Sequence, residues 1–251
     1  MDAAPDPGQR PIYKRVLLKL SGEALAGDGG TGLFDPTVLQ LVASEARDVL
    51  ARDVQVAIVV GGGNIVRGSD LSRRLGIDEV TGHTMGMLAT VINGLALMDA
   101  MEQVGLVVRV QSSIEMHQVA EPYIRRRALR HLEKGRVVIF VAGTGSPYFS
   151  TDTAAALRAI EMQADALLMA KKGVSGVYDK DPRQHPDAVM YTHLDYMDIL
   201  NRDLRVMDAT AAALCKDNNM DIVVFDVTRP GNITRAVVGE AIGTLVGSAR
   251  R

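Results

Sequence analysis

Short apolar runs rich in β-branched residues alternate with helical patterns along most of this chain, and this alternation constrains the fold most strongly. Six runs are predicted strands, at residues 16–20, 54–60, 106–110, 137–142, 166–170 and 222–226. Strands that alternate with helices are typical of a parallel sheet covered on both faces. The sequence therefore predicts the α/β fold class, as a three-layer α/β/α sandwich with a mainly parallel central sheet.

Nothing in the pattern divides the chain into separate domains. Its 251 residues are 47% hydrophobic, which is enough for a sizeable core, and no linker-like stretch or internal repeat interrupts them. The amino end has no apolar segment like that of a signal peptide. We predict a loose N-terminal tail over residues 1–13 and a single domain over residues 14–251.

Composition excludes several classes of protein. A net charge of −2 and the absence of tryptophan argue against a nucleic-acid partner. No apolar run approaches the roughly 20 residues needed to cross a bilayer. The lone Cys215 cannot form an internal disulfide, and the five histidines lack metal-ligand spacing, so no metal-ligating side chains are predicted. We expect a cytoplasmic protein with neither a nucleic-acid nor a membrane partner.

Three helices and one irregular segment are predicted with clear boundaries. Asp35 followed by Pro36 is typical of a helix start. Met85–Met101 is apolar nearly all round, which predicts a helix buried in the core or at a subunit contact. A third helix is expected over Ser150–Ala164. Lys171–Pro186 mixes prolines and glycines with charges and predicts an exposed hairpin or flap.

Two glycine-rich turns each follow an apolar run. Gly61-Gly62-Gly63 follows the second run, and Gly143-Thr144-Gly145 follows the fourth. Backbone N–H groups in such turns approach anionic oxygens closely, and a following helix adds a favourable dipole. Neither turn completes the dinucleotide pattern G-x-G-x-x-G, and the chain has no G-x-x-x-x-G-K-[ST]. Either turn alone could be a tight connection, but the two together predict a site for more than one phosphate group.

Charged residues flank these turns. Lys19 ends an apolar strand and precedes Ser21-Gly22, so it could contact phosphoryl oxygens or, alternatively, extend to water. Arg67 is expected about one helical turn beyond the first glycine turn, either over the same anion or as a solvated helix residue. Asp152 opens the third helix, as a cap or as a carboxylate that orients Lys19 or magnesium.

Two further segments carry side chains suited to a nucleotide. Thr144–Thr151 offers hydroxyl groups, backbone donors and two aromatic rings directly before a helix; its alternative is an ordinary capped turn. In the flap, the ring of Tyr178 could stack on a base and Asp181 could accept from a ribose hydroxyl. Taken alone, an exposed hairpin is the better interpretation of that segment.

Taken in order, these motifs resemble the amino acid kinase family and, within it, the bacterial uridylate kinases. The resemblance covers residues 14–246. It is carried by five segments, KLSGEAL at Lys19–Leu25, GGGNIVRG at Gly61–Gly68, MGMLATVINGLAL at Met85–Leu97, AGTGSPYFSTDTAA at Ala142–Ala155 and VYDKDP at Val177–Pro182. It implies the amino acid kinase fold and transfer of a phosphoryl group from ATP with Mg²⁺ to UMP, giving UDP and ADP in pyrimidine nucleotide synthesis.

The resemblance also assigns roles by position. It implies catalytic roles for Lys19, Arg67 and Asp152. ATP contacts are implied for Lys19, Leu20, Ser21, Gly22, Gly63, Arg67, Lys172, Tyr178 and Asp181. UMP contacts are implied for Gly62, His83, Thr144, Gly145, Ser146, Pro147, Tyr148, Phe149, Ser150 and Thr151. Similar enzymes are homohexamers activated by GTP and inhibited by UTP, and Gly27–Gly32 resembles the loop linked to GTP activation.

Two positions depart from the family pattern. His83 stands where an aspartate that contacts UMP is usual, and Ser175 stands where the flap usually has an aspartate. Both departures bear on acceptor affinity and nucleotide regulation. Two alternatives therefore stay open, a kinase of the same family with another small acceptor, and a weakly active or non-catalytic paralogue that binds nucleotides or oxyanions.

Overall fold

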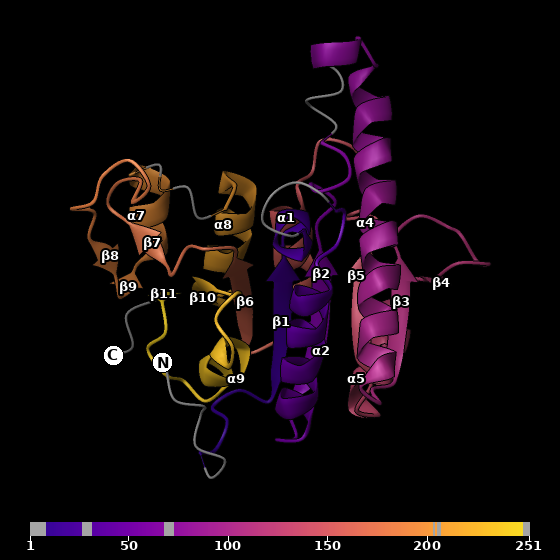
Figure 1. Cartoon of the computed structure of the whole chain (residues 1–251), viewed down its shortest axis with the longest axis horizontal. Helices are drawn as coiled ribbons and strands as arrows, with labels where there is room; N and C mark the ends of the chain where they lie inside the picture. Colours follow the sequence, from indigo (N-terminus) through magenta and orange to yellow (C-terminus); the bar gives the residue numbers. More distant parts are fainter. Residues whose placement is uncertain (1–8, 27–31, 68–72, 203, 205–206, 248–251) are drawn as a thin grey trace.

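A nine-stranded sheet runs through the described part of the molecule, with helices on both faces (Figure 1). The computed structural model describes residues 9–26, 32–67, 73–202, 204 and 207–247. The strand order is β4-β3-β5-β2-β1-β6-β10-β11-β9, and every neighbouring pair is parallel except β10 with β11. The strands are β1 (Arg15–Leu20), β2 (Gln55–Val60), β3 (Val108–Ser112), β4 (Glu121–Pro122), β5 (Val137–Val141), β6 (Ala166–Lys171), β9 (His193–Leu194), β10 (Asp221–Asp226) and β11 (Thr244–Val246). This arrangement confirms the predicted fold class.

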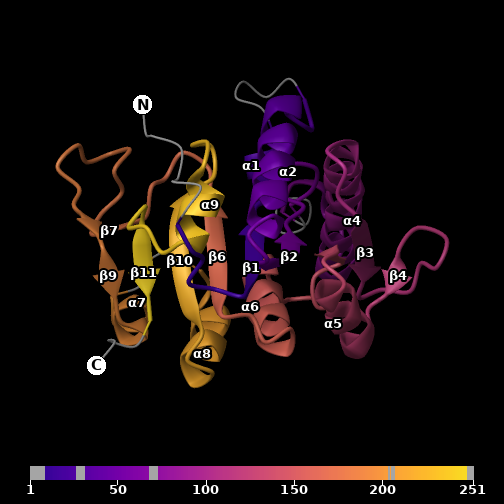
Figure 2. The same cartoon turned by 90° about the horizontal axis from the view of Figure 1, so that it is seen from below.

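The helices form one layer on each face of the sheet. Figure 2 shows α2 and α9 on one side and α6 and α8 on the other. The helices are α1 (Gly22–Leu25), α2 (Pro36–Leu50), α4 (Glu79–Gln103), α5 (Arg125–Glu133), α6 (Thr151–Glu161), α7 (Tyr196–Asn201), α8 (Ala209–Asp217) and α9 (Asn232–Val237). The sheet thus lies between two helical layers, as the periodicity predicted.

Alternating side chains of the central strands supply two apolar cores. In β1, Val16, Leu18 and Leu20 belong to the core beneath α2 and α4, whereas Leu17 belongs to the core beneath α6. Successive residues of a strand point to opposite faces of the sheet. Lys19 therefore shares the α6 face with Leu17, and this register decides which partners its ammonium group can reach.

Local sequence signals account for several helix boundaries. Asp35 caps α2 by accepting a hydrogen bond from Thr37 N at 2.8 Å, with Pro36 at the first helical position. Asp78 caps α4 through Thr81 N, so this helix begins six residues before the predicted Met85. The apolar pattern marked only the part of α4 that packs on the sheet, and the cap further upstream sets its real start.

Residues 171–191 confirm the predicted hairpin. Strand β7 (Val177–Tyr178) pairs antiparallel with β8 (Met190–Tyr191) in a small second sheet. The turn region between them carries the charged and proline-rich sequence that suggested a flap. Strands of two residues, like β4 and β9, are too short to show a periodic pattern and were not predicted.

The chain changes direction across the sheet at β1, which lies between β2 and β6. Strands β2, β5 and β3 extend the sheet to one side of β1, and β6 and β10 extend it to the other. Open α/β sheets bind ligands at the carboxyl ends of strands where the order reverses in this way. The topology therefore directs attention to the ends of β1, β2 and β6.

Part of the predicted tail contacts the rest of the protein. Residues 9–13 of the tail are described; Ile12 N donates to Val237 O at 3.0 Å, and Tyr13 is buried.

By length and composition alone, helix α4 could cross a membrane, and the core helices of soluble proteins often have the same length and composition. In this structure α4 packs against α2 and the sheet.

Candidate active site

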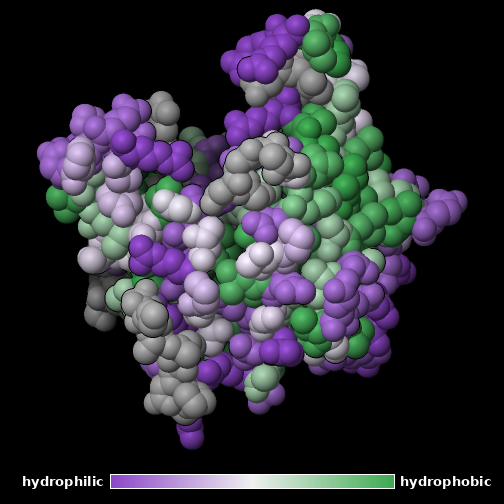
Figure 3. Space-filling view, viewed as in Figure 1, coloured by the Kyte–Doolittle hydropathy of each residue, from purple (hydrophilic) through white to green (hydrophobic). Residues whose placement is uncertain are grey.

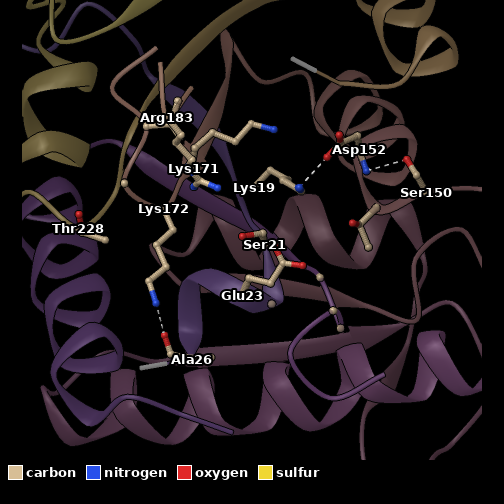
Figure 4. A pocket seen from close by; sticks show the side chains of 17 residues that line it. Lys19, Ser21, Glu23, Ala26, Ser150, Asp152, Lys171, Lys172, Arg183 and Thr228 are labelled. Carbon is tan, nitrogen blue, oxygen red and sulfur yellow. Dashed lines mark hydrogen bonds and ion pairs between the residues drawn. The ribbon is translucent and has the colours of Figure 1, made fainter. Parts of the chain in front are cut away.

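The carboxyl ends of β1 and β6, the turn after β2 and the start of α6 surround a cavity of about 870 Å³ (Figure 4). Among the described residues, its charged lining comprises four basic side chains and two carboxylates, namely Lys19, Lys171, Lys172, Arg183, Glu23 and Asp152. A concave surface with an excess of basic groups attracts anionic ligands. The lining therefore favours a multiply charged anion such as a polyphosphate.

Lys19 and Asp152 form an ion pair in this cavity. Lys19 Nζ lies 2.6 Å from Asp152 Oδ1, and the two side chains are 7% and 18% exposed. The contact is a close charge pair without hydrogen-bond alignment, because Asp152 Oδ1 is buried and has no hydrogen-bond partner among the described residues. The side chain of Lys19 does not extend to water, and pairing offsets the cost of burying its charge.

The position of Asp152 follows from the start of α6. Ser150 is the N-cap, and its Oγ accepts hydrogen bonds from Asp152 N and Thr153 N, both at 3.0 Å. The hydroxyl groups of Ser150 and Thr153 both donate to the carboxylate of Asp208, which caps α8. A carboxylate in a first helical turn is favoured by the helix dipole. Two capped helices thus hold Asp152 opposite Lys19.

The glycines of the site lie where backbones meet. A Cβ atom on Gly22 would lie 2.4 Å from Asn64 Oδ1 and 2.7 Å from Gly63 N. A Cβ atom on Gly62 would lie 2.8 Å from both Ala89 Cβ and the carbonyl oxygen of Gly86 in α4. Such distances leave no room for a side chain, so glycine is required for the turn after β2 to pack between α1 and α4.

The expectation that the first glycine turn leads into a helix was wrong. Residues 61–67 form a turn and irregular chain. Arg67 therefore does not lie on a helix, and its guanidinium group pairs with the carboxylate of Glu23, both side chains being about half exposed. Of these two residues, Glu23 is in the cavity lining. Gly68 and residues 69–72 lie outside the described residues.

Lys171 is a site residue that sequence reasoning missed. It ends β6, which pairs with β1 in parallel register, Lys19 opposite Met169. Burial lowers the pKa of Lys171, and the nearby charge of Lys19 lowers it further, whereas Asp152 and Glu23 act in the opposite direction. A lysine at the end of an apolar strand was the signal used for Lys19. The same signal was present at Lys171, but the residue was assigned to the flap.

Lys172 lies in the cavity lining but is engaged with the protein. Its Nζ donates a hydrogen bond to Ala26 O at 2.6 Å, which joins the base of the flap to the end of α1 (Figure 4). Ala26 directly precedes residues 27–31, which carry most of the predicted Gly27–Gly32 loop and lie outside the described residues. The expected contact of Lys172 with adenosine stays a prediction.

A second cavity, of about 530 Å³, adjoins the first under the flap. Tyr178 and Asp181 line it, as does Arg183, which also lines the first cavity. The Asp181 carboxylate accepts from Arg183 N at 2.9 Å and from Gln184 Nε2 at 3.2 Å. Two of the three predicted adenosine residues thus line one cavity, and Lys171, Val174 and Arg183 line both this cavity and the first.

The Thr144–Thr151 segment connects β5 to α6. Ser150 and Thr151 line the first cavity, whereas Tyr148 and Phe149 are exposed, by 63% and 53%. Tyr148 has a positive φ of 68°, which is uncommon for a residue with a side chain. The segment therefore presents hydroxyl groups toward the cavity and its two rings toward solvent.

His83 lies beside this segment, and its expected contact with UMP stays a prediction. Its ring centroid is 4.9 Å from that of Tyr148, at an angle of 51°, and its Nε2 lies 3.8 Å from Glu79 Oε1. The ring comes from the amino-terminal part of α4. The structure therefore brings the unusual histidine to the predicted acceptor segment.

Six lining residues besides Lys171 were not singled out by the sequence, namely Glu23, Ala26, Gly173, Val174, Arg183 and Thr228. Glu23 belongs to the four-residue α1, and the others lie in turns, bends or irregular chain, where no periodic pattern marks a position as buried or facing a ligand. Asp226 explains how two are placed, because its Oδ1 accepts from Gly173 N and Thr228 N, both at 3.0 Å. This arrangement depends on tertiary contacts that the sequence does not display.

Comparison with known proteins places this geometry in a family. Residues 14–226 match the model of the amino acid kinase family. The structure is similar to a UMP kinase from Bacillus anthracis, with 43% identity and a TM-score of 0.91 over 96% of this chain and 98% of that one. A UMP kinase from Ureaplasma parvum is 38% identical, with a TM-score of 0.88 over 94% and 99% of the two chains. A uridylate kinase from Archaeoglobus fulgidus is 29% identical, with a TM-score of 0.71 over 92% of this chain and 99% of that one. This chain belongs to the amino acid kinase family.

Proposed function

We propose that this chain is a UMP kinase, which transfers the γ-phosphoryl group of ATP to UMP and produces UDP and ADP. The similarity to two UMP kinases over nearly the whole chain supports this activity and agrees with the expectation from the sequence motifs. The observation that carries the chemistry is the buried Lys19–Asp152 ion pair, in a cavity with more basic than acidic side chains. The product UDP would serve pyrimidine nucleotide synthesis.

The reaction joins two anions, so charge is the main obstacle. The attacking atom is an oxygen of the UMP phosphate, which is already deprotonated, so no side chain has to act as a base. Catalysis then rests on positioning and on stabilising the charge of the transferring group. Lys19 supplies a fixed positive charge for that group, Asp152 orients Lys19, and Arg67 exchanges its contact with Glu23 for a phosphate oxygen.

The donor and acceptor phosphates meet at the first glycine turn in this proposal. Residues 19–22 and Gly63 contact the phosphates of ATP, and Gly62 contacts the phosphate of UMP. Lys171 belongs to the same group, because its partly buried side chain lines the cavity together with Lys19. The presence of Gly22, Gly62 and Gly63 in the cavity lining supports this assignment, because backbone N–H groups of glycine turns can approach anionic oxygens closely.

The residues present suit a Mg²⁺ ion that arrives with ATP. Among the described residues no three His, Cys, Asp or Glu side chains form a metal-binding group. Mg²⁺ commonly uses only one or two carboxylates together with substrate phosphates. Asp152 fits that role because it is one of the two carboxylates described in the cavity lining, and its Oδ1 lies 2.6 Å from Lys19 Nζ, where the transferring phosphate is expected. When bound, the ion would neutralise negative charge on the phosphates.

The two nucleosides occupy opposite sides of this phosphate site. Tyr178 stacks on adenine and Asp181 accepts from the ribose in the second cavity, and Lys172 contacts the adenosine from the first cavity. The UMP ribose and uracil lie along Thr144–Thr151, beside His83. The presence of Arg183 in the linings of both cavities supports the adenosine side, and the contact between His83 and Tyr148 supports the acceptor side.

A coupled assay of ADP release tests the proposal directly. Purified protein with ATP and Mg²⁺ is given UMP, CMP, glutamate or carbamate in turn, with and without GTP. ADP release that requires UMP and stops when EDTA removes Mg²⁺ supports the proposal. Turnover with another acceptor would identify a different kinase of the family. Binding of UMP and ATP by calorimetry without turnover would identify a non-catalytic paralogue.

Assembly and regulation extend the proposal. Helix α4 exposes Val80, Leu88 and Ile92, and Figure 3 shows hydrophobic residues gathered along it. An exposed apolar strip of this kind marks a protein contact, so we expect a cytoplasmic homohexamer built from dimers through α4. GTP is expected to activate it and UTP to inhibit it. Light scattering after gel filtration measures the assembly, and ADP release with each nucleotide measures the regulation.

A further inference from the structure

Helix α4 carries two buried polar side chains that reach both glycine turns of the site. Thr90 is 2% exposed and Asn93 is fully buried, and they lie three residues apart on one face of the helix. Buried polar groups of this kind are almost always committed to specific hydrogen bonds. The partners of these two residues lie in the turn after β2 and in the turn after β5.

Asn93 holds the first turn. Its Nδ2 donates to Gly61 O at 2.6 Å and to Asn64 Oδ1 at 2.7 Å, and its Oδ1 accepts from Asn64 Nδ2 at 3.2 Å. Asn64 Nδ2 also donates to Leu33 O at 2.8 Å. The amide of Asn93 thus fixes both ends of the Gly61–Asn64 turn to α4.

Thr90 holds the second turn. Its Oγ1 accepts a hydrogen bond from Ala142 N at 2.7 Å and donates one to Met87 O at 2.7 Å. Ala142 begins the turn after β5 and has a positive φ of 60°, a left-handed conformation that is unfavourable for alanine. The hydroxyl of Thr90 therefore secures the peptide at which the chain leaves the sheet.

The two turns lie beyond the last paired residues of β2 and β5, so hydrogen bonds between these two strands do not fix the distance between the turns. Strands β2 and β5 pair through Ala57–Val138, Ile58–Ile139 and Val59–Phe140, which is the last pair of that ladder. Beyond it, the first turn is also held by Leu20 and the second by Ser113, and α4 is an element that contacts both turns, with Gly62 packed against it without room for a side chain. A single rigid helix therefore connects the two segments that must hold the reacting phosphate and its nucleoside.

We propose that Thr90 and Asn93 are positioning residues, which fix the distance between the turn where the phosphates meet and the turn that begins the UMP site. This inference rests on the proposed function. Neither side chain is among the residues that line the cavity, so both act through the backbone of the turns. In-line transfer is sensitive to displacements of about 1 Å, which can reduce rates by on the order of 100-fold.

The first test compares Thr90→Val with Thr90→Ser. Valine keeps the shape but removes the hydroxyl, whereas serine keeps the hydroxyl. With Thr90→Val we expect kcat to fall by about tenfold and KM for UMP to rise by about tenfold, with KM for ATP within about twofold. With Thr90→Ser we expect values near those of the unchanged protein. Thr234→Val is the matched control, because Thr234 is equally buried in α9 and does not line the cavity.

A second readout does not depend on catalysis. Hydrogen exchange of the Ala142 amide should become at least about tenfold faster in Thr90→Val, because its acceptor is lost, and should stay slow in Thr90→Ser. Amides of β5 within the ladder, such as that of Ile139, serve as the internal reference. If the unchanged protein does not phosphorylate UMP but Ala142 exchange responds in this way, the positioning contact stands and the proposed function fails.

Asn93→Asp tests the other contact. The substitution keeps the shape but replaces the donating amide with an oxygen that repels Gly61 O, so we expect kcat to fall by about tenfold or more. The inference is overturned if Thr90→Val leaves kcat, KM for UMP and Ala142 exchange within about twofold of the unchanged protein. It is also overturned if Thr90→Ser is as impaired as Thr90→Val, because packing and not the hydroxyl would then be responsible.

Discussion

The phosphate end of the cavity and its two nucleoside ends are built in different ways. Lys19 and Lys171 lie at the ends of paired central strands, and the Lys19 side chain is 7% exposed. Tyr148 is 63% exposed on a loop, and Tyr178 belongs to a strand of two residues in a separate hairpin. The positive charges that are proposed to face the phosphates are therefore held in place before any substrate binds. The aromatic side chains proposed to contact the nucleosides instead lie on an exposed loop and a short hairpin.

This difference matches what each end must do. Electrostatic stabilisation of a transition state is most effective when charges are already oriented and need no reorganisation. Recognition of a base and a sugar, by contrast, can tolerate segments that close on the ligand after it binds. We therefore expect substitutions at the phosphate end to reduce turnover, and substitutions at the nucleoside ends to change KM for one nucleotide.

The largest effect is expected from Lys19→Ala. Loss of the buried ammonium should lower kcat by on the order of 1,000-fold, because its charge acts on the transferring phosphoryl group, with only a modest loss of UMP binding. ADP release measures kcat, and calorimetry measures UMP affinity. Lys14→Ala is the matched control, because Lys14 is exposed near the start of the same strand. Near-normal turnover of Lys19→Ala would remove this lysine from the mechanism.

Lys171→Met should separate activity from stability. We expect kcat to fall by about 100-fold through loss of a charge beside Lys19. The free energy of unfolding should rise by about 1 kcal/mol, because methionine keeps the apolar stem and avoids the burial of a charge. Chemical denaturation beside the activity assay measures both. A variant that lost stability together with activity would show that Lys171 is mainly structural.

The pH dependence of stability gives an independent check on Lys171. Burial lowers its pKa below the usual 10.5. Between the lowered pKa and 10.5, the unfolded chain binds more protons than the folded chain, so the contribution of Lys171 to stability increases as pH rises through this window. In Lys171→Met that increase should be absent, which unfolding curves at several alkaline pH values would measure. Identical pH slopes for the two proteins would contradict the burial of this charge.

The same contrast explains how much of the molecule the sequence could predict. The central strands and the helix start at Asp35-Pro36 were predictable, because apolar periodicity and capping residues are local signals. The ion pair between Lys19 and Asp152 was expected from the family resemblance and is present. The contacts of Asn93 and Thr90 with the turns depend on packing between distant segments, which no local pattern displays.

Errors were concentrated where the chain leaves regular structure. Residues 61–67 are not helical as was expected, so Arg67 lies in irregular chain and pairs with Glu23. Lys171 was assigned to the flap because it is followed by Lys172-Gly173, although it is the last residue of β6. In both cases the end of a strand was predictable, but the path of the next few residues was set by tertiary contacts.

At the adenosine end, Tyr178→Leu should raise KM for ATP by about tenfold while KM for UMP stays within about twofold. The leucine keeps an apolar side chain in β7 but removes the ring, and stacking of a base on an aromatic ring is worth about 1–3 kcal/mol. Tyr191→Leu is the control on the paired strand β8, because Tyr191 lies outside the residues that line the second cavity. Equal effects of the two substitutions on KM for ATP would indicate damage to the hairpin as a whole.

The smallest effect is expected at the acceptor end, from His83→Asp. The side chain lies against Tyr148 next to the proposed UMP site, and an aspartate there restores the residue that the family pattern usually has. A carboxylate accepts a ribose hydroxyl bond more strongly than a neutral imidazole does, so KM for UMP should fall by about threefold with kcat nearly unchanged. His117→Asp, at an exposed histidine paired with Glu115, controls for the change in charge. Unchanged or weaker UMP affinity by calorimetry would mean that His83 does not occupy the position of that aspartate. The acceptor end would then recognise UMP through the Thr144–Thr151 segment alone.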